Sequence, residues 1–154
     1  MSSVTRVVLD ANIFISMGIK PFGPPARAVR ACAERADIDV LVCPTLVHEV
    51  ERRILRDKRL TTLISRPRGI EILSYLRTRF LQLPDPSAVP RVAPQRKDDY
   101  LYALARQNGA AVIVTGDKAL QNHPEQDPPV VSPQTFLADP LFNVGFGPAE
   151  NPVP

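Results

Sequence analysis

The chain has 154 residues, enough to bury a core as a single domain, and its 44% hydrophobic and 23% charged residues are typical of globular proteins. No run approaches the ~20 apolar residues of a membrane span, and Asp10 comes too early for the apolar core of a signal peptide, so we expect a cytoplasmic protein with no membrane partner. The net charge of +3 excludes no class of partner by itself. Cys32 and Cys43 have no CxxC neighbour and are expected to be reduced, buried thiols.

Short runs rich in β-branched residues alternate with longer stretches of helical periodicity. Strands are predicted over residues 7–9, 39–43, 110–114 and 130–131, and helices over residues 26–36, 45–56, 69–83 and 98–108. Asn108 and Gly109 are typical of a helix stop. The alternation predicts an α/β fold with a mainly parallel sheet.

The remaining stretches define the domain limits. Four prolines between residues 84 and 94 predict a connecting loop. The end of the chain is rich in glycine and proline, so we predict one domain over residues 1–140 and an irregular tail over residues 141–154.

Acidic residues occur where the predicted strands end and the predicted helices begin. Asp10 directly follows the first strand, Glu49 lies about one turn into the helix after the second, Asp98 and Asp99 open the last helix, and Asp117 follows the third strand. Strand carboxyl ends and helix N-termini share one edge of a right-handed βαβ fold. We therefore expect these acids to meet at the edge where open α/β folds bind ligands.

Each acid also has a structural interpretation when taken alone. Asp10 fits a turn, Asp98 fits a helix N-cap, and Asp117 fits a cap for residues 118–120. Glu49 is placed to pair with Arg53 four residues later. Their convergence favours a binding site, because four neighbouring carboxylates raise one another's pKa and require a compensating cation.

The donor set favours a hard cation. Carboxylate oxygens suit Mg²⁺ or Mn²⁺. Zinc fits poorly, because His48 and His123 are the only histidines and neither cysteine lies in a metal-binding spacing.

Four stretches in order, "VVLDANIFIS", "PTLVHEVERRI", "RKDDYLYALA" and "VIVTGDKAL", resemble the PIN-domain nucleases over roughly residues 5–137. More closely, they resemble the subgroup that forms the toxin component of toxin–antitoxin pairs. The resemblance implies a three-layer fold with a short, mainly parallel central sheet flanked by helices. The stretch "PFGPPARA" departs from the family pattern in length, which affects loop geometry but not the acids.

The family pattern maps onto individual residues. Asp10 matches the first acid, and Asn12 matches the small polar residue that steadies it. Glu49 matches the second acid, with Glu51 as a weaker competitor.

The third acid of the pattern has two candidates. Asp98 fits better, because Leu101 and Ala105 then lie at +3 and +7, where the family's helix turns apolar residues to the core. Asp99 is the alternate or a helper.

Asp117 matches the fourth acid, accompanied by the hydroxyl of Thr115. The resemblance implies that bound Mg²⁺ or Mn²⁺ hydrolyses phosphodiester bonds, usually in RNA. Asp10, Asp98 and Asp117 would be metal ligands, directly or through water, and Glu49 would complete the shell or orient the attacking water. These four acids are the expected catalytic residues.

A basic segment lies between residues 52 and 79, with nine basic residues against two acids. Such a segment is either a solvated helical face or a surface for a polyanion. Beside a nuclease site, RNA contact is the favoured interpretation, through Arg52, Arg53, Arg56, Lys58 and Arg59. Tyr100 or Tyr102 could stack on a base, although a half-buried helix face is the preferred placement.

The resemblance also implies a homodimer and a cognate antitoxin. The alternative function is a non-catalytic PIN-like scaffold that binds RNA or a partner protein. A phosphatase-type hydrolase with an aspartate nucleophile is disfavoured, because that chemistry usually places a second Asp two positions later, where Asn12 stands.

Overall fold

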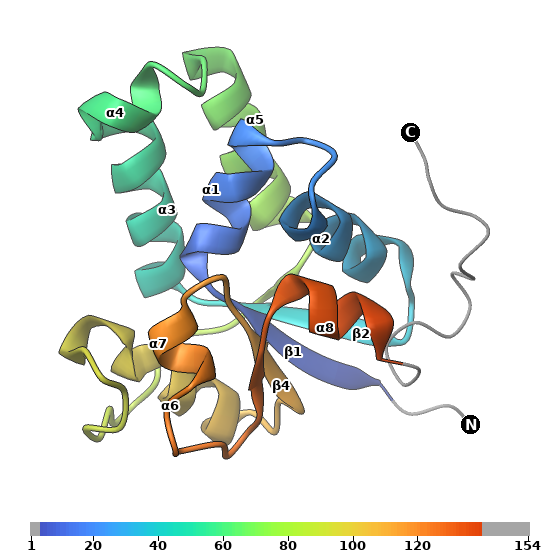
Figure 1. The fold of residues 1–154 in the computed structure, drawn as a ribbon, viewed down its shortest axis with the longest axis vertical. Helices are drawn as coiled ribbons and strands as arrows, with labels where there is room; N and C mark the ends of the chain where they lie inside the picture. Colours follow the sequence, from blue (N-terminus) through green and yellow to red (C-terminus); the bar gives the residue numbers. More distant parts are fainter. Residues whose placement is uncertain (1–3, 140–154) are drawn as a thin grey trace.

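A computed structural model describes residues 4–139 of the chain. The centre is a five-stranded sheet with the strand order β3-β2-β1-β4-β5, in which every pairing is parallel (Figure 1). The strands are β1 (Thr5–Leu9), β2 (Ile38–Val42), β3 (Leu81–Gln82), β4 (Val112–Val114) and β5 (Val130–Val131). The prediction of an α/β fold with a short parallel sheet is confirmed.

Helices cover both faces of the sheet and give three layers (Figure 1). Helices α1, α2, α3 and α5 contact one another above the sheet in this view, and α6 lies below it against β1 and β4. The described helices are α1 (Ala11–Ile19), α2 (Pro24–Glu34), α3 (Pro44–Arg56), α4 (Lys58–Thr61), α5 (Arg66–Thr78), α6 (Asp99–Gln107), α7 (Lys118–Gln121) and α8 (Pro133–Ala138), with a 3₁₀ turn at Arg96–Asp98. None of them is long and apolar enough to cross a bilayer.

The central strand β1 is apolar because helices cover it on both faces. Val7, Val8 and Leu9 are fully buried, as expected for an inner strand of a parallel sheet. This burial fixes the end of β1 rigidly in the core, so the residue that follows it, Asp10, has a well-defined position.

Helix α3 buries one stripe and leaves its opposite face to solvent. Leu46, Val50 and Ile54 are buried at near-helical spacing, within the helix predicted over residues 45–56. Helix α5 packs closely against this stripe at Gly69, where an added Cβ would lie 2.4 Å from Cγ2 of Ile54. A larger residue there would force the two helices apart.

The helix predicted over residues 69–83 is partly wrong. It begins earlier and ends at Thr78, and Leu81 and Gln82 instead form β3, paired with Leu41 and Val42. The strand was missed because two residues are too few to show an alternating pattern.

Other local predictions are confirmed. The loop over residues 84–94 contains no helix or strand, and α6 stops before Gly109, which has a φ of 67° that a glycine adopts without strain. Cys32 and Cys43 are free and buried. The predicted tail over residues 141–154 lies outside the described residues.

Candidate active site

The strand order creates a switch point beside β1. The chain continues from β1 to β2 on one side and later returns to β4 on the other. Ligands bind outside the carboxyl ends of the strands at such points in open α/β sheets. Asp10 follows β1 here, and Thr115 follows β4.

Asp10 is a buried carboxylate held by two side-chain donors. It is 6% exposed, and its backbone amide donates to the carbonyl of Val114 over 2.9 Å. The Thr115 hydroxyl donates to Oδ2 of Asp10 over 2.7 Å, and the Asn12 amide donates to the same oxygen over 3.2 Å. These bonds orient Asp10 at the sheet edge.

Asn12 and Thr115 also join the ends of β1 and β4. Asn12 donates to the Thr115 hydroxyl over 3.2 Å and accepts from the Gly116 amide over 3.2 Å. The Thr115 hydroxyl accepts from the Asp117 amide over 3.0 Å. The network therefore fixes the start of the loop that carries Asp117.

The electrostatic state of Asp10 is unusual. Burial, together with the charge of Asp98, raises its pKa to about 6, although the Thr115 hydrogen bond opposes the shift. A buried carboxylate with a raised pKa at the carboxyl end of a sheet strand is typical of a functional site.

Asp98 lies at the junction of the 3₁₀ turn and α6 and is 6% exposed. Burial raises the pKa of Asp98, and the charges of Asp117 and Glu49 add to this shift. Lys97 opposes the shift, because its ammonium lies 3.4 Å from Oδ1 of Asp98. Asp98 therefore interacts electrostatically with the three other acids of the predicted set. The sequence reasoning missed Lys97, although it directly precedes the acidic pair.

Asp99 faces a different group of residues. Its carboxylate is 2% exposed and accepts hydrogen bonds from Arg91 over 2.5 Å and from the Val92 and Ala93 amides over 3.0 and 2.7 Å. Burial acts to raise its pKa, but these hydrogen bonds hold the pKa below its usual range. Asp99 thus holds the preceding loop against α6.

The side chain of Glu49 on α3 is 31% exposed, and its charge acts on Asp98. Both of its oxygens accept from Arg52, over 3.1 and 3.0 Å, so the partner lies at i+3 rather than at the predicted Arg53. Arg53 instead lies 3.8 Å from Asp57.

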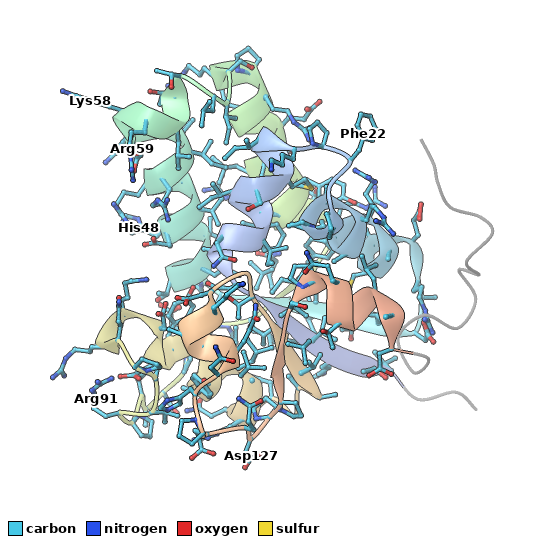
Figure 2. The ribbon with its side chains drawn as sticks, viewed as in Figure 1. Phe22, His48, Lys58, Arg59, Arg91 and Asp127 are labelled. Atoms are coloured by element: carbon cyan, nitrogen blue, oxygen red, sulfur yellow. The ribbon has the colours of Figure 1, made fainter. Side chains whose placement is uncertain are left out.

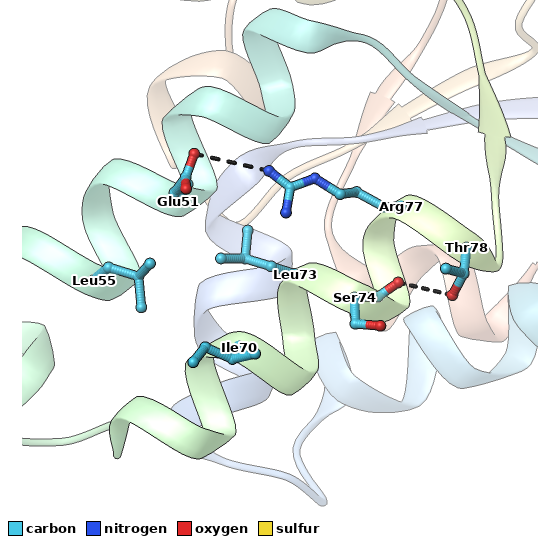
Figure 3. A pocket seen from close by; sticks show the side chains of 7 residues that line it. All are labelled: Glu51, Leu55, Ile70, Leu73, Ser74, Arg77 and Thr78. Atoms are coloured by element: carbon cyan, nitrogen blue, oxygen red, sulfur yellow. Dashed lines mark hydrogen bonds and ion pairs between the residues drawn. The ribbon is translucent and has the colours of Figure 1, made fainter.

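Glu51, the weaker competitor, belongs to another surface. It lies 3.8 Å from Arg77 and lines a pocket of about 330 Å³ between α3 and α5, with an apolar floor that includes Leu55, Ile70 and Leu73 (Figure 3). Glu51 therefore faces α5 and not the carboxyl edge of the sheet.

Asp117 caps α7, as its structural interpretation predicts. Its Oδ1 accepts from the Ala119 amide over 2.8 Å, which leaves Oδ2 without a hydrogen bond among residues 4–139.

The four acids lie toward one edge of the sheet, but their side chains do not form a closed metal-binding site. Within residues 4–139, no three acidic, histidine or cysteine side chains lie close enough together to hold a metal ion as they stand. Glu49 and Asp98 each face a cation of the chain, Arg52 and Lys97. The donor chemistry nevertheless fits Mg²⁺ or Mn²⁺, because it offers only carboxylate oxygens and the charge of Asp98 raises the pKa of Asp10 although Lys97 opposes this shift.

Further basic residues lie on α3 and on α4, which is at the end of α3 away from the sheet (Figure 1). In the view of Figure 2, Lys58 and Arg59 extend outward on the side of the molecule where His48 lies. Arg56, Lys58 and Arg59 are exposed and make no ion pair within the described part of the chain. They are therefore available to an external anion.

The two tyrosines of α6 do not form an exposed surface on which a base could stack. Tyr100 is half-buried, as the preferred placement has it, whereas Tyr102 is 1% exposed and is neither half-buried nor open to a base. Both hydroxyl oxygens are buried. No sequence pattern indicates this, because periodicity places a residue on a helix face but not its polar tip.

Comparison with known proteins identifies the family. A family model described as PIN domain matches residues 6–119. The chain belongs to the PIN-domain family. The match includes Asp10, Glu49, Asp98 and Asp117 of this PIN domain.

Solved structures agree with this fold. The PIN domain is similar to PAE2754 from Pyrobaculum aerophilum, with a TM-score of 0.61 and 19% identity over 86% of this chain and 87% of that one. It is also similar to VapBC2 from Rickettsia felis bound to a DNA fragment from their promoter, with a TM-score of 0.56 and 12% identity over 83% of this chain and 98% of that one. No match was found among curated proteins.

Proposed function

We propose that this PIN domain is a divalent-metal-dependent endoribonuclease that hydrolyses phosphodiester bonds in RNA. The observation that carries the proposal is the buried carboxylate of Asp10, whose pKa is raised to about 6 at the switch point of the sheet. Burying a charge is costly unless a partner compensates it. A divalent cation is the partner that an all-carboxylate edge selects.

Asp10, Asp98 and Asp117 are the proposed ligands of Mg²⁺ or Mn²⁺. The bound ion would lower the pKa of a water molecule and stabilise the charge that develops on the phosphate. Thr115 and Asn12 keep Asp10 oriented through the hydrogen bonds described above.

Glu49 completes the set in this proposal. Its carboxylate either joins the ligands or orients the attacking water by accepting its proton in a hydrogen bond. Asp99 has a positioning role, because its bonds to the loop at Arg91–Ala93 fix the start of α6 and so the place of Asp98.

The exposed cations would bind the RNA backbone. Arg56, Lys58 and Arg59 supply exposed positive charge at the end of α3 away from the sheet, and Arg52 and Arg53 lie on α3 between them and Glu49. Phosphate contacts of this kind give affinity that falls with salt and carry no sequence preference.

We further propose that the protein is the toxin of a toxin–antitoxin pair, acts in the cytoplasm, forms a homodimer, and is inhibited by a cognate antitoxin. The motif resemblance supports this, together with the similarity to VapBC2 from Rickettsia felis bound to a DNA fragment from their promoter.

Replacing Glu49 with glutamine is expected to lower RNA cleavage at least about tenfold, because the neutral amide accepts no proton and binds a hard cation poorly. Glu51→Gln on the same helix is the matched control and should stay within about twofold of wild type, since Glu51 faces α5. The assay follows cleavage of labelled single-stranded RNA with Mg²⁺ or Mn²⁺, and with EDTA.

Cleavage that persists in EDTA would refute the metal mechanism. If wild type cleaves no RNA and the Glu49 and Asp10 variants bind RNA as wild type does, the protein is a non-catalytic PIN-like scaffold. If Glu49→Gln and Glu51→Gln lose the same amount of RNA cleavage, Glu49 has no specific role in the proposed active site.

A further inference from the structure

The loop between α7 and β5 is tied to the loop before α6 by the side chain of His123. Nε2 of this partly buried histidine lies 2.8 Å from the carbonyl oxygen of Val92. Because a carbonyl oxygen can only accept, Nε2 carries the proton and donates. The two residues are 31 positions apart in the chain, so the hydrogen bond joins two separate loops.

The loop that receives this bond is itself bonded to the start of α6. The amide of Val92 donates to Oδ1 of Asp99 over 3.0 Å, and the amide of Ala93 donates to the same oxygen over 2.7 Å. Asp99 is the first residue of α6 and adjoins Asp98. A shift of Val92 would therefore be passed to the residue beside Asp98.

The backbone that carries His123 is fixed to the end of β4. His123 lies two residues beyond α7, which begins directly after Asp117. The side-chain amide of Gln121 donates to the carbonyl of Thr115 over 2.7 Å, and the hydroxyl of Thr115 donates to Asp10 over 2.7 Å. The position of His123 is thus coupled to the residues that orient Asp10.

The other side of His123 is held as well. The side-chain amide of Gln126 donates to the carbonyl of His123 over 2.8 Å, and Oε1 of Gln126 accepts from the amide of Val130 over 2.8 Å. Val130 begins β5. The imidazole therefore projects from a backbone that is tied to the sheet on both sides.

The same loop has a second tie, at the far end of α6. Nε of Arg106 donates to the carbonyl of Asp127 over 2.5 Å, and the guanidinium lies 3.3 Å from Glu125. Arg106 lies in the last turn of α6, away from the acids at its start. It offers a control that loosens the same loop at a place remote from Asp98.

We propose that His123 is a positioning residue of the nuclease site: its hydrogen bond to Val92 sets where Asp98 lies relative to Asp10. The inference rests on the proposed function, in which these acids act together. His123 acts through the loop before α6 and not by contact with the reacting atoms. Catalysis is sensitive to such placement, because a displacement of about 1 Å can cost about 100-fold in rate.

The test is the steady-state cleavage of labelled single-stranded RNA with Mg²⁺ or Mn²⁺. His123→Ala should lower kcat about tenfold and keep KM within about twofold, because the exposed cations of α3 and α4 are unchanged. His123→Gln should recover kcat to within about threefold of wild type, since its side-chain amide can donate to the same carbonyl. Arg106→Gln should keep kcat within about twofold.

Amide signals in ¹H–¹⁵N spectra, recorded in EDTA, report the placement without any cleavage. The signals of Asp98 and Asp99 should shift in His123→Ala and stay in place in His123→Gln and Arg106→Gln. His123→Asn, whose side chain is shorter than that of glutamine, replaces the alanine variant if that variant does not fold.

Three results would overturn the positioning role: an unchanged kcat in His123→Ala, the same loss of kcat in His123→Gln, or the same loss in Arg106→Gln. Wild type that cleaves no RNA overturns the proposed function. The amide signals then decide the placement by His123 on their own, and unshifted signals of Asp98 and Asp99 in His123→Ala overturn it too.

Discussion

Replacing Asp10 with asparagine is expected to reduce RNA cleavage at least about 100-fold while making the metal-free protein more stable above pH 6. Loss of a direct ligand should exceed the 10- to 100-fold effects seen for partners of ligands. The gain in stability follows from the burial of Asp10, because asparagine keeps an acceptor for Thr115 and Asn12 without a buried charge.

The pH dependence has a defined sign. The folded-state pKa of Asp10, about 6, lies above the ~3.9 of an unfolded aspartate, so the folded protein holds the proton more tightly. The stability from this group is full below about pH 4 and is lost as the pH rises through 6, a cost of about 3 kcal/mol at higher pH. Asp10→Asn removes that cost.

Urea unfolding in EDTA at pH 4, 6 and 8 measures the effect. The difference in free energy of unfolding between Asp10→Asn and wild type should increase with pH and level off above about pH 7. Asp127→Asn, which changes an exposed acid on another side of the molecule, is the control and should show no widening (Figure 2). A variant that is less stable than wild type at pH 8 would contradict the assignment of a raised pKa.

Alanine at two neighbouring positions is expected to give opposite results. Asp98→Ala should lose cleavage at least about 100-fold with no loss of stability, because it relieves repulsion with Asp10. Asp99→Ala should cost about 3 kcal/mol of stability, because Arg91 and the Val92 and Ala93 amides lose their acceptor.

Cleavage assays and chemical unfolding of both variants, at a temperature where each is folded, distinguish the two roles. Asp99→Asn, which keeps one acceptor oxygen, extends the comparison if the alanine variant does not fold. The proposed roles would be exchanged if Asp98→Ala were strongly destabilised but fully active. They would also be exchanged if Asp99→Ala lost cleavage without losing stability.

Most of the fold could be predicted because its main elements are long or strongly patterned. The run Val7–Leu9 and the stripe Leu46, Val50 and Ile54 appear in the structure as buried strand and helix face. The patterns predict neither the helices α1, α4 and α8 nor the strand β3, whose two residues take strand geometry from pairing with β2 rather than from local preference.

The position of the acids could be predicted, but their partners could not. Parallel connection places Asp10 and Asp117 at one edge whatever the side chains do. The choice between Asp98 and Asp99 depends on a loop that folds back to offer Arg91 and two amides, and loop conformation is not visible in periodicity. The Glu49–Arg52 pair likewise depends on rotamers.

The most direct measurement of the central claim is an anomalous difference map from crystals grown with Mn²⁺. We expect a peak at the carboxyl edge of the sheet, coordinated by Asp10 and Asp98, with Asp117 bound directly or through water and Glu49 turned away from Arg52. Crystals at saturating Mn²⁺ that show no peak at this edge would contradict the proposal that these acids form a metal site.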